Sequence, residues 1–61
     1  MANLTEKELS VLEDSLNEEQ LLVKKYQTYA QMCSDPTIKS HCEQMAGQHR
    51  NHFNRLVSFL N

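Results

Sequence analysis

The chain has 61 residues and a formal net charge of −2, which allows one small domain and supplies no basic stripe for nucleic acid. One Gly and one Pro leave too few turn residues for an all-β fold and no glycine-rich phosphate-binding loop. A hydrophobic fraction of 39% is too high for disorder, and no apolar run is long enough to cross a membrane. We therefore expect one small all-α domain with neither nucleic acid nor membrane as a partner.

The first predicted helix spans about residues 5–33. Thr5 is a favourable N-cap residue, and Glu8 three positions later completes a capping box. Glu6 and Glu8 also place negative charge where the helix dipole favours it. Nothing breaks the helical pattern before the segment 34–36, which reads Ser-Asp-Pro. Because the residue before a proline avoids the α conformation, the first helix must end there.

The second predicted helix spans about residues 36–60, after a turn at residues 34–35. Asp35 is suited to the N-cap position, and Pro36 to the first helical position. So short a connection makes the two helices antiparallel neighbours. The whole chain is therefore predicted to be a single helical hairpin.

Both helices carry apolar residues at heptad spacing, in stripes about three positions wide. The predicted core positions are Leu9, Leu12, Leu16, Glu19, Val23, Tyr26, Ala30 and Cys33 in the first helix, and Ile38, Cys42, Met45, His49, His52, Leu56 and Phe59 in the second. One neighbouring helix cannot cover stripes this wide, and a solitary hairpin would expose a large apolar patch. We therefore expect two copies to pair as a homodimeric four-helix bundle.

Three of these core positions carry polar side chains, namely Glu19, His49 and His52. Antiparallel helices joined near residue 34 place Glu19 opposite the two histidines, which are themselves neighbours on one helix face. A carboxylate among apolar residues needs a compensating partner. Protonated histidines, a hydrogen bond from Tyr26, or a divalent metal would each supply one.

Three interpretations of this polar layer follow. The first is a metal-free, hydrogen-bonded layer that fixes helix register and pairing. The second is a metal site, in which Glu19, His49 and His52 bind iron, manganese or zinc. The third is a solvated group of side chains without a role. His41 lies off the main stripe and is expected to be exposed.

Cys33 and Cys42 are the two cysteines of the chain. They do not form a CxxC pair, and the N-terminal residues do not look like a signal peptide. We therefore expect two reduced structural thiols and a cytoplasmic location.

The spacing of several residues resembles the ferritin-like superfamily. Glu19 and Tyr26 are seven residues apart, as are a metal-binding Glu and a Tyr in that superfamily. The segment 46–52 reads Ala-Gly-Gln-His-Arg-Asn-His, which is similar to the superfamily's Ala-x-x-Glu-x-x-His with His49 in place of Glu. Within the superfamily the chain looks most like small spore coat F-type proteins, through segments 4–9, 19–26 and 48–56.

The resemblance implies a structural protein that dimerises into a ferritin-like four-helix bundle and assembles with other coat proteins in the spore coat, without enzymatic activity. The alternative that it implies is a metal-binding protein with a reduced Glu/His site. A dimer would offer two carboxylates and four histidines, whereas di-iron members of the superfamily use four carboxylates, so iron oxidation is not expected. A third alternative is an adaptor hairpin that binds a longer helical partner.

Overall fold

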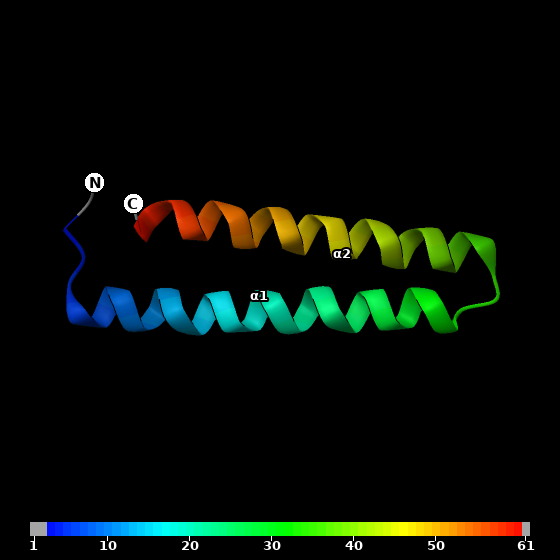
Figure 1. Cartoon of the computed structure of the whole chain (residues 1–61), viewed down its shortest axis with the longest axis horizontal. Coiled ribbons are helices and arrows are strands. Elements are labelled where there is room, and N and C mark those ends of the chain that lie inside the picture. Colours follow the sequence, from blue (N-terminus) through cyan, green and yellow to red (C-terminus); the bar gives the residue numbers. More distant parts are fainter. Residues whose placement is uncertain (1–2, 61) are drawn as a thin grey trace.

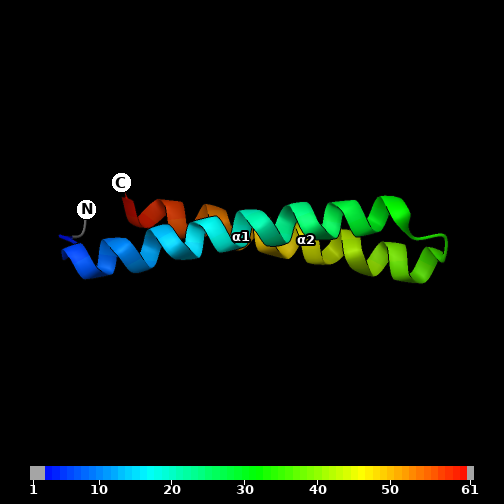
Figure 2. The same ribbon diagram turned by 90° about the horizontal axis from the view of Figure 1, so that it is seen from below.

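Two α-helices form an antiparallel hairpin in the computed structural model, which describes residues 3–60 (Figure 1). They are α1 (Glu6–Met32) and α2 (Pro36–Val57), and a short 3-10 helix, η1 (Ser58–Leu60), follows α2. The two helices lie side by side along a rod of 46 × 16 × 10 Å (Figures 1 and 2). This confirms the predicted all-α class and the helical hairpin.

The start of α1 is held by a capping box at Thr5 and Glu8. The Thr5 hydroxyl accepts a hydrogen bond from the Glu8 backbone N–H at 3.0 Å, and the Glu8 carboxylate accepts one from the Thr5 N–H at 3.0 Å. Two N–H groups that a helix start leaves without partners are thereby satisfied. The same carboxylate stabilises the positive end of the helix dipole.

The turn between the helices is made by three residues, 33–35. Cys33 is the C-cap of α1, with an extended backbone conformation, and its N–H still donates to the Tyr29 carbonyl at 2.9 Å. Asp35 is the N-cap of α2, and its carboxylate accepts from the backbone N–H groups of Thr37 at 2.8 Å and Ile38 at 3.1 Å. The local sequence therefore closes both helix ends within a very short connection.

The end of α2 differs from the sequence-based expectation. The α-helix stops at Val57, and residues 58–60 form a tighter 3-10 turn. The Ser58 hydroxyl donates to the Arg55 carbonyl, and its N–H is directed at the same group. Bonds over three residues in place of four tighten the last turn of many helices, which explains the change at Ser58.

The hairpin buries few side chains by itself. The buried residues are Leu12, Ala30, Cys42 and Ala46. Four of the predicted core residues are instead substantially exposed, Leu9 at 39%, Ile38 at 54%, Phe59 at 51% and the side chain of His52 at 49%. A single neighbouring helix covers only the middle of each apolar stripe, so the flanks of the stripe face solvent.

Within residues 3–60, neither helix has a stretch that is long and apolar enough to span a membrane.

Candidate functional site

The side chains of Glu19, His49 and His52 meet between α1 and α2, and we call them the Glu/His cluster. Nδ1 of His49 lies 2.6 Å from one carboxylate oxygen of Glu19, and Nδ1 of His52 lies 3.5 Å from the other. One potential ligand atom from each of the three residues lies within 4.8 Å of the others. The convergence expected from the helix register is therefore present in the hairpin.

Burial differs within the Glu/His cluster. The side chains of Glu19 and His49 are 19% and 17% exposed, whereas that of His52 is 49% exposed. Glu19 and His49 thus form the inner part of the cluster, and His52 lies at its outer edge. A carboxylate oxygen accepts hydrogen bonds, so the short contact requires the proton on Nδ1 of His49.

Aromatic rings extend the Glu/His cluster along one side of the hairpin. The rings of Tyr26 and His49 stack at 5.8 Å with an interplanar angle of 7°. Tyr29 packs edge-on against Tyr26 at 6.0 Å, and His52 packs edge-on against His49 at 5.6 Å. Tyr26 thus supports the position of the His49 ring through stacking, whereas a hydrogen bond from Tyr26 to Glu19 was one of the three compensations that the sequence left open.

The ammonium group of Lys25 lies over Tyr29, the last ring of this row on α1. Nζ of Lys25 lies 5.8 Å from the centre of the Tyr29 ring, within the range of a cation–π contact. The sequence analysis missed both this contact and the Tyr26–His49 stack. Heptad spacing places residues on a face, but ring orientation depends on rotamers that only packing selects.

The chemistry of the Glu/His cluster suits a divalent transition metal. Imidazole nitrogen and carboxylate oxygen are ligands of zinc, iron and manganese. A metal between Glu19 and His49 would replace the proton that now joins them, because a ligating imidazole nitrogen carries no proton. Three protein ligands would leave further coordination positions for water or for another chain. His41 is exposed and takes no part in the cluster.

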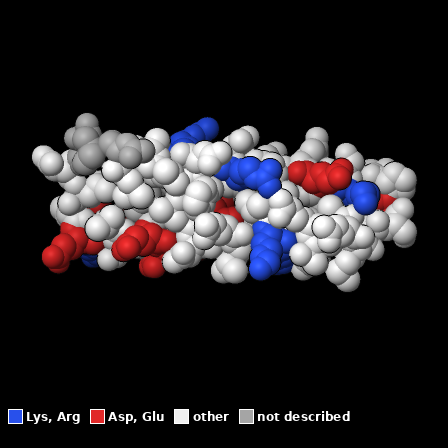
Figure 3. Space-filling model, viewed as in Figure 1, with Lys and Arg blue, Asp and Glu red and all other residues white. Residues whose placement is uncertain are grey.

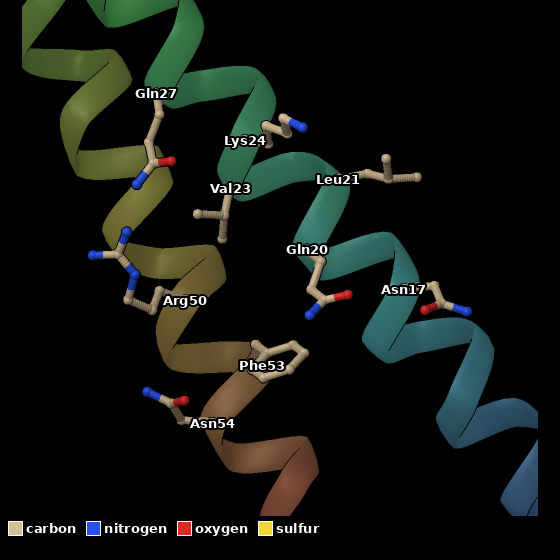
Figure 4. A pocket seen from close by; sticks show the side chains of 9 residues that line it. All are labelled: Asn17, Gln20, Leu21, Val23, Lys24, Gln27, Arg50, Phe53 and Asn54. Carbon is tan, nitrogen blue, oxygen red and sulfur yellow. The ribbon is translucent and has the colours of Figure 1, made fainter.

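The opposite side of the hairpin mixes polar and apolar side chains. A groove there is lined by side chains that include Gln20, Gln27, Arg50 and Asn54, with Phe53 at its floor (Figure 4). Seen from the same direction as Figure 1, acidic side chains gather over the first half of α1 and basic side chains over the middle of the hairpin (Figure 3). Leu21, which is 69% exposed, also lines this groove, so this side presents apolar as well as amide and charged groups.

The side that holds the Glu/His cluster is apolar at its flanks. Residues seven apart in a helix point in nearly the same direction. In α2 one such row contains Ile38, Met45, His52 and Phe59. In α1 a matching row contains Leu22 and Tyr29, and Val11 lies in the same direction three helical turns before Leu22. The contacts from Tyr29 through Tyr26 and His49 to His52 connect the two rows. We call these two rows, without His52, the apolar face.

Comparisons with protein-family models, with curated proteins and with solved structures find no match to this chain. The hairpin with its Glu/His cluster and apolar face is therefore the basis for a functional assignment. The resemblance to spore coat F-type proteins remains a prediction from the sequence.

Proposed function

We propose that the chain is a structural protein that acts as a homodimer, in which the apolar faces of two hairpins pack together into a four-helix bundle. The observation that carries this proposal is the exposure of large apolar side chains along the apolar face. Val11, Tyr29, Ile38 and Phe59 are each between 44% and 59% exposed, and all belong to the apolar face. Exposed apolar patches on small proteins are typical of interaction surfaces.

A second copy is the occupant that this face fits best. The apolar row of α2 extends from Ile38 to Phe59, and that of α1 from Val11 to Tyr29 with Ser15 between, so an antiparallel helical pair of the same length would cover both rows together. The Glu/His clusters of the two chains would then meet in the interior of the bundle, where buried polar residues specify helix register and pairing. The resemblance to spore coat proteins supports an assembly role and adds other coat proteins as candidate partners.

Light scattering coupled to size-exclusion chromatography tests the homodimer. We expect a mass of twice the 7.1 kDa of the single chain at micromolar concentration. Met45→Glu places a charge in the apolar face, so it should dissociate the dimer at the same concentration. Gln44→Glu adds the same group at the adjacent, exposed position and should leave the dimer intact.

Folding is followed in the same samples by circular dichroism, since a dimer can be required for a stable fold. Ile38→Glu is a second variant, because Ile38 is already 54% exposed in the hairpin and contributes less to its interior than the half-buried Met45. A helical, monodisperse monomer of the wild type would refute the homodimer. A stable complex with a different helical protein would favour the adaptor alternative.

Binding of a divalent metal is a second candidate function, favoured by the approach of three ligand atoms to within 4.8 Å. Elemental analysis of protein purified without an affinity tag, followed by equilibrium dialysis against zinc, manganese or ferrous iron, tests it. His52→Ala should weaken binding on the order of tenfold or more by removing a ligand. His41→Ala removes an exposed histidine outside the cluster and should have no effect. Equal binding by both variants would refute this site.

A further inference from the structure

The two cysteines lie at the turn end of the hairpin, Cys33 as the C-cap residue that follows α1 and Cys42 as a buried residue of α2. Tyr26 and His49 stack across the helix pair with their ring centres 5.8 Å apart. Cys33 is seven residues after Tyr26 in α1, and Cys42 is seven residues before His49 in α2. The helices are antiparallel, and residues seven apart lie on the same helix face. Moving seven residues toward the turn from the stacked Tyr26 and His49 therefore places Cys33 opposite Cys42.

Cys33 is the C-cap residue of α1, but its backbone N–H still makes the helical hydrogen bond, so the residue starts from the position that the helix would give it. Its N–H donates to the Tyr29 carbonyl at 2.9 Å, as it would inside the helix. Cys42 is buried at 5% exposure, and Cys33 is half-buried. Both are free thiols. The pair therefore consists of one thiol that solvent reaches and one thiol behind it.

From this facing position and unequal exposure, we infer that Cys33 and Cys42 form a thiol pair that a disulfide oxidant such as oxidised glutathione converts into an intramolecular disulfide. In the first step the Cys33 thiolate attacks the oxidant, a mixed disulfide forms, and one glutathione thiolate leaves. In the second step the Cys42 sulfur, after losing its proton, attacks the Cys33 sulfur and releases the second glutathione. Two protein thiols are oxidised while one glutathione disulfide is reduced to two thiols.

The environment of Cys42 supports this order of events. Burial raises the pKa of the Cys42 thiol above its ordinary value of 9.0, and the neighbouring Cys33 raises it further. A protonated, buried thiol reacts slowly with an oxidant in solution, since the thiolate is the nucleophile. Cys33 is then the first thiol to react, and Cys42 resolves the mixed disulfide from within the packed layer.

The bond would join the end of α1 to the second turn of α2. It would close a short loop that contains the turn and the start of α2, residues 34–41, and reduce the conformational freedom of the unfolded chain. The proposal is independent of the homodimer, because both thiols come from one hairpin.

Incubation of the reduced, full-length protein with oxidised glutathione tests the inference. We expect a mass loss of about 2 Da, for two hydrogens, and a Cys33–Cys42 linked peptide pair after cleavage at Lys39. On a denaturing, non-reducing gel the oxidised protein should migrate as a monomer, because the disulfide joins two cysteines of the same chain. The melting temperature should rise by about 10 °C and return to its original value with a reducing agent.

Single-cysteine variants separate the two roles. Cys42→Ser should stop at the mixed disulfide and retain glutathione on Cys33, whereas Cys33→Ser should react much more slowly. Disulfides between chains, a persistent glutathione adduct on wild-type Cys33, or two thiols that stay reduced would each overturn the inference. Reaction at Cys42 in Cys33→Ser as fast as at Cys33 in Cys42→Ser would overturn the assigned order.

Discussion

Glu19 accepts a hydrogen bond of 2.6 Å from His49, a residue 30 positions away on the other helix. Within residues 3–60 it is the only side-chain hydrogen bond between α1 and α2. The hydrogen bonds made by the side chains of Thr5, Glu8, Thr28, Asp35 and Ser58 join residues two to four positions apart. Together with the longer 3.5 Å contact from His52 to the other Glu19 oxygen, this bond links two helices that otherwise meet largely through apolar contacts, and its net energetic value can be measured.

Removal of one partner of this contact should destabilise the protein. His49→Leu leaves the largely buried carboxylate of Glu19 without its closest donor, and we expect a loss of about 1–3 kcal/mol in the free energy of unfolding. The combined variant Glu19→Leu, His49→Leu, His52→Leu removes the polar groups together and should be as stable as the wild type or more stable.

Urea unfolding followed by circular dichroism in the presence of a chelator compares these variants. A chelator removes any stabilisation that bound metal adds to the folded state. A combined variant that is much less stable than His49→Leu would contradict the prediction and indicate that the Glu/His cluster stabilises the fold strongly.

Two leucines of α1 that differ in burial should differ in how much their replacement by alanine destabilises the hairpin. Leu12 is 8% exposed, so Leu12→Ala should cost about 2–4 kcal/mol through lost contacts and a cavity. Leu21 is 69% exposed, and Leu21→Ala should change stability by no more than about 0.5 kcal/mol. The two variants make the same substitution in the same helix. Equal losses in urea unfolding would show that the helix packs through a different face.

The start of α2 should depend on Asp35. Its carboxylate accepts two backbone N–H groups, and Asp35→Ala leaves both without this partner. We expect a loss of about 1 kcal/mol, measured by thermal unfolding. Ser34→Ala changes the exposed neighbouring residue and serves as the control. Similar losses in both variants would mean that the turn as a whole, and not the cap, is sensitive to substitution.

The capping box predicts a pH dependence of stability through Glu8. Hydrogen bonds from the backbone N–H and the hydroxyl of Thr5 lower the pKa of Glu8 below its ordinary value of 4.5. A lowered folded-state pKa means that the charged carboxylate stabilises the folded chain. This contribution is complete above the unfolded-state pKa and is lost as the pH falls through the folded-state pKa.

Thermal unfolding of wild type and Glu8→Gln between neutral pH and pH of about 3 checks this effect. The wild type should be more stable at neutral pH, and the difference should decrease on acidification because glutamine does not titrate. Glu8 is fully exposed, so added salt should reduce the difference as well. A difference between the two proteins that is constant with pH would exclude the charge of Glu8 as its cause.

Local signals in the sequence determined the hairpin. The capping box at Thr5, the proline at position 36 and the N-cap at Asp35 act within a few residues, so they specify helix ends without knowledge of the tertiary structure. Register in an antiparallel pair follows from the turn position, which is why the proximity of Glu19 to His49 and His52 could be predicted.

Tertiary packing decided what periodicity alone could not. A heptad pattern treats Leu12 and Phe59 alike, yet the first is buried and the second is 51% exposed, since one neighbouring helix covers only the centre of a stripe. The stack of Tyr26 on His49 and the greater exposure of His52 depend on side-chain rotamers, and the 3-10 turn after Val57 depends on bonds made by Ser58. The sequence by itself therefore determined the helices and their register, while the tertiary structure decided which side chains are covered and how the rings around Glu19 are arranged.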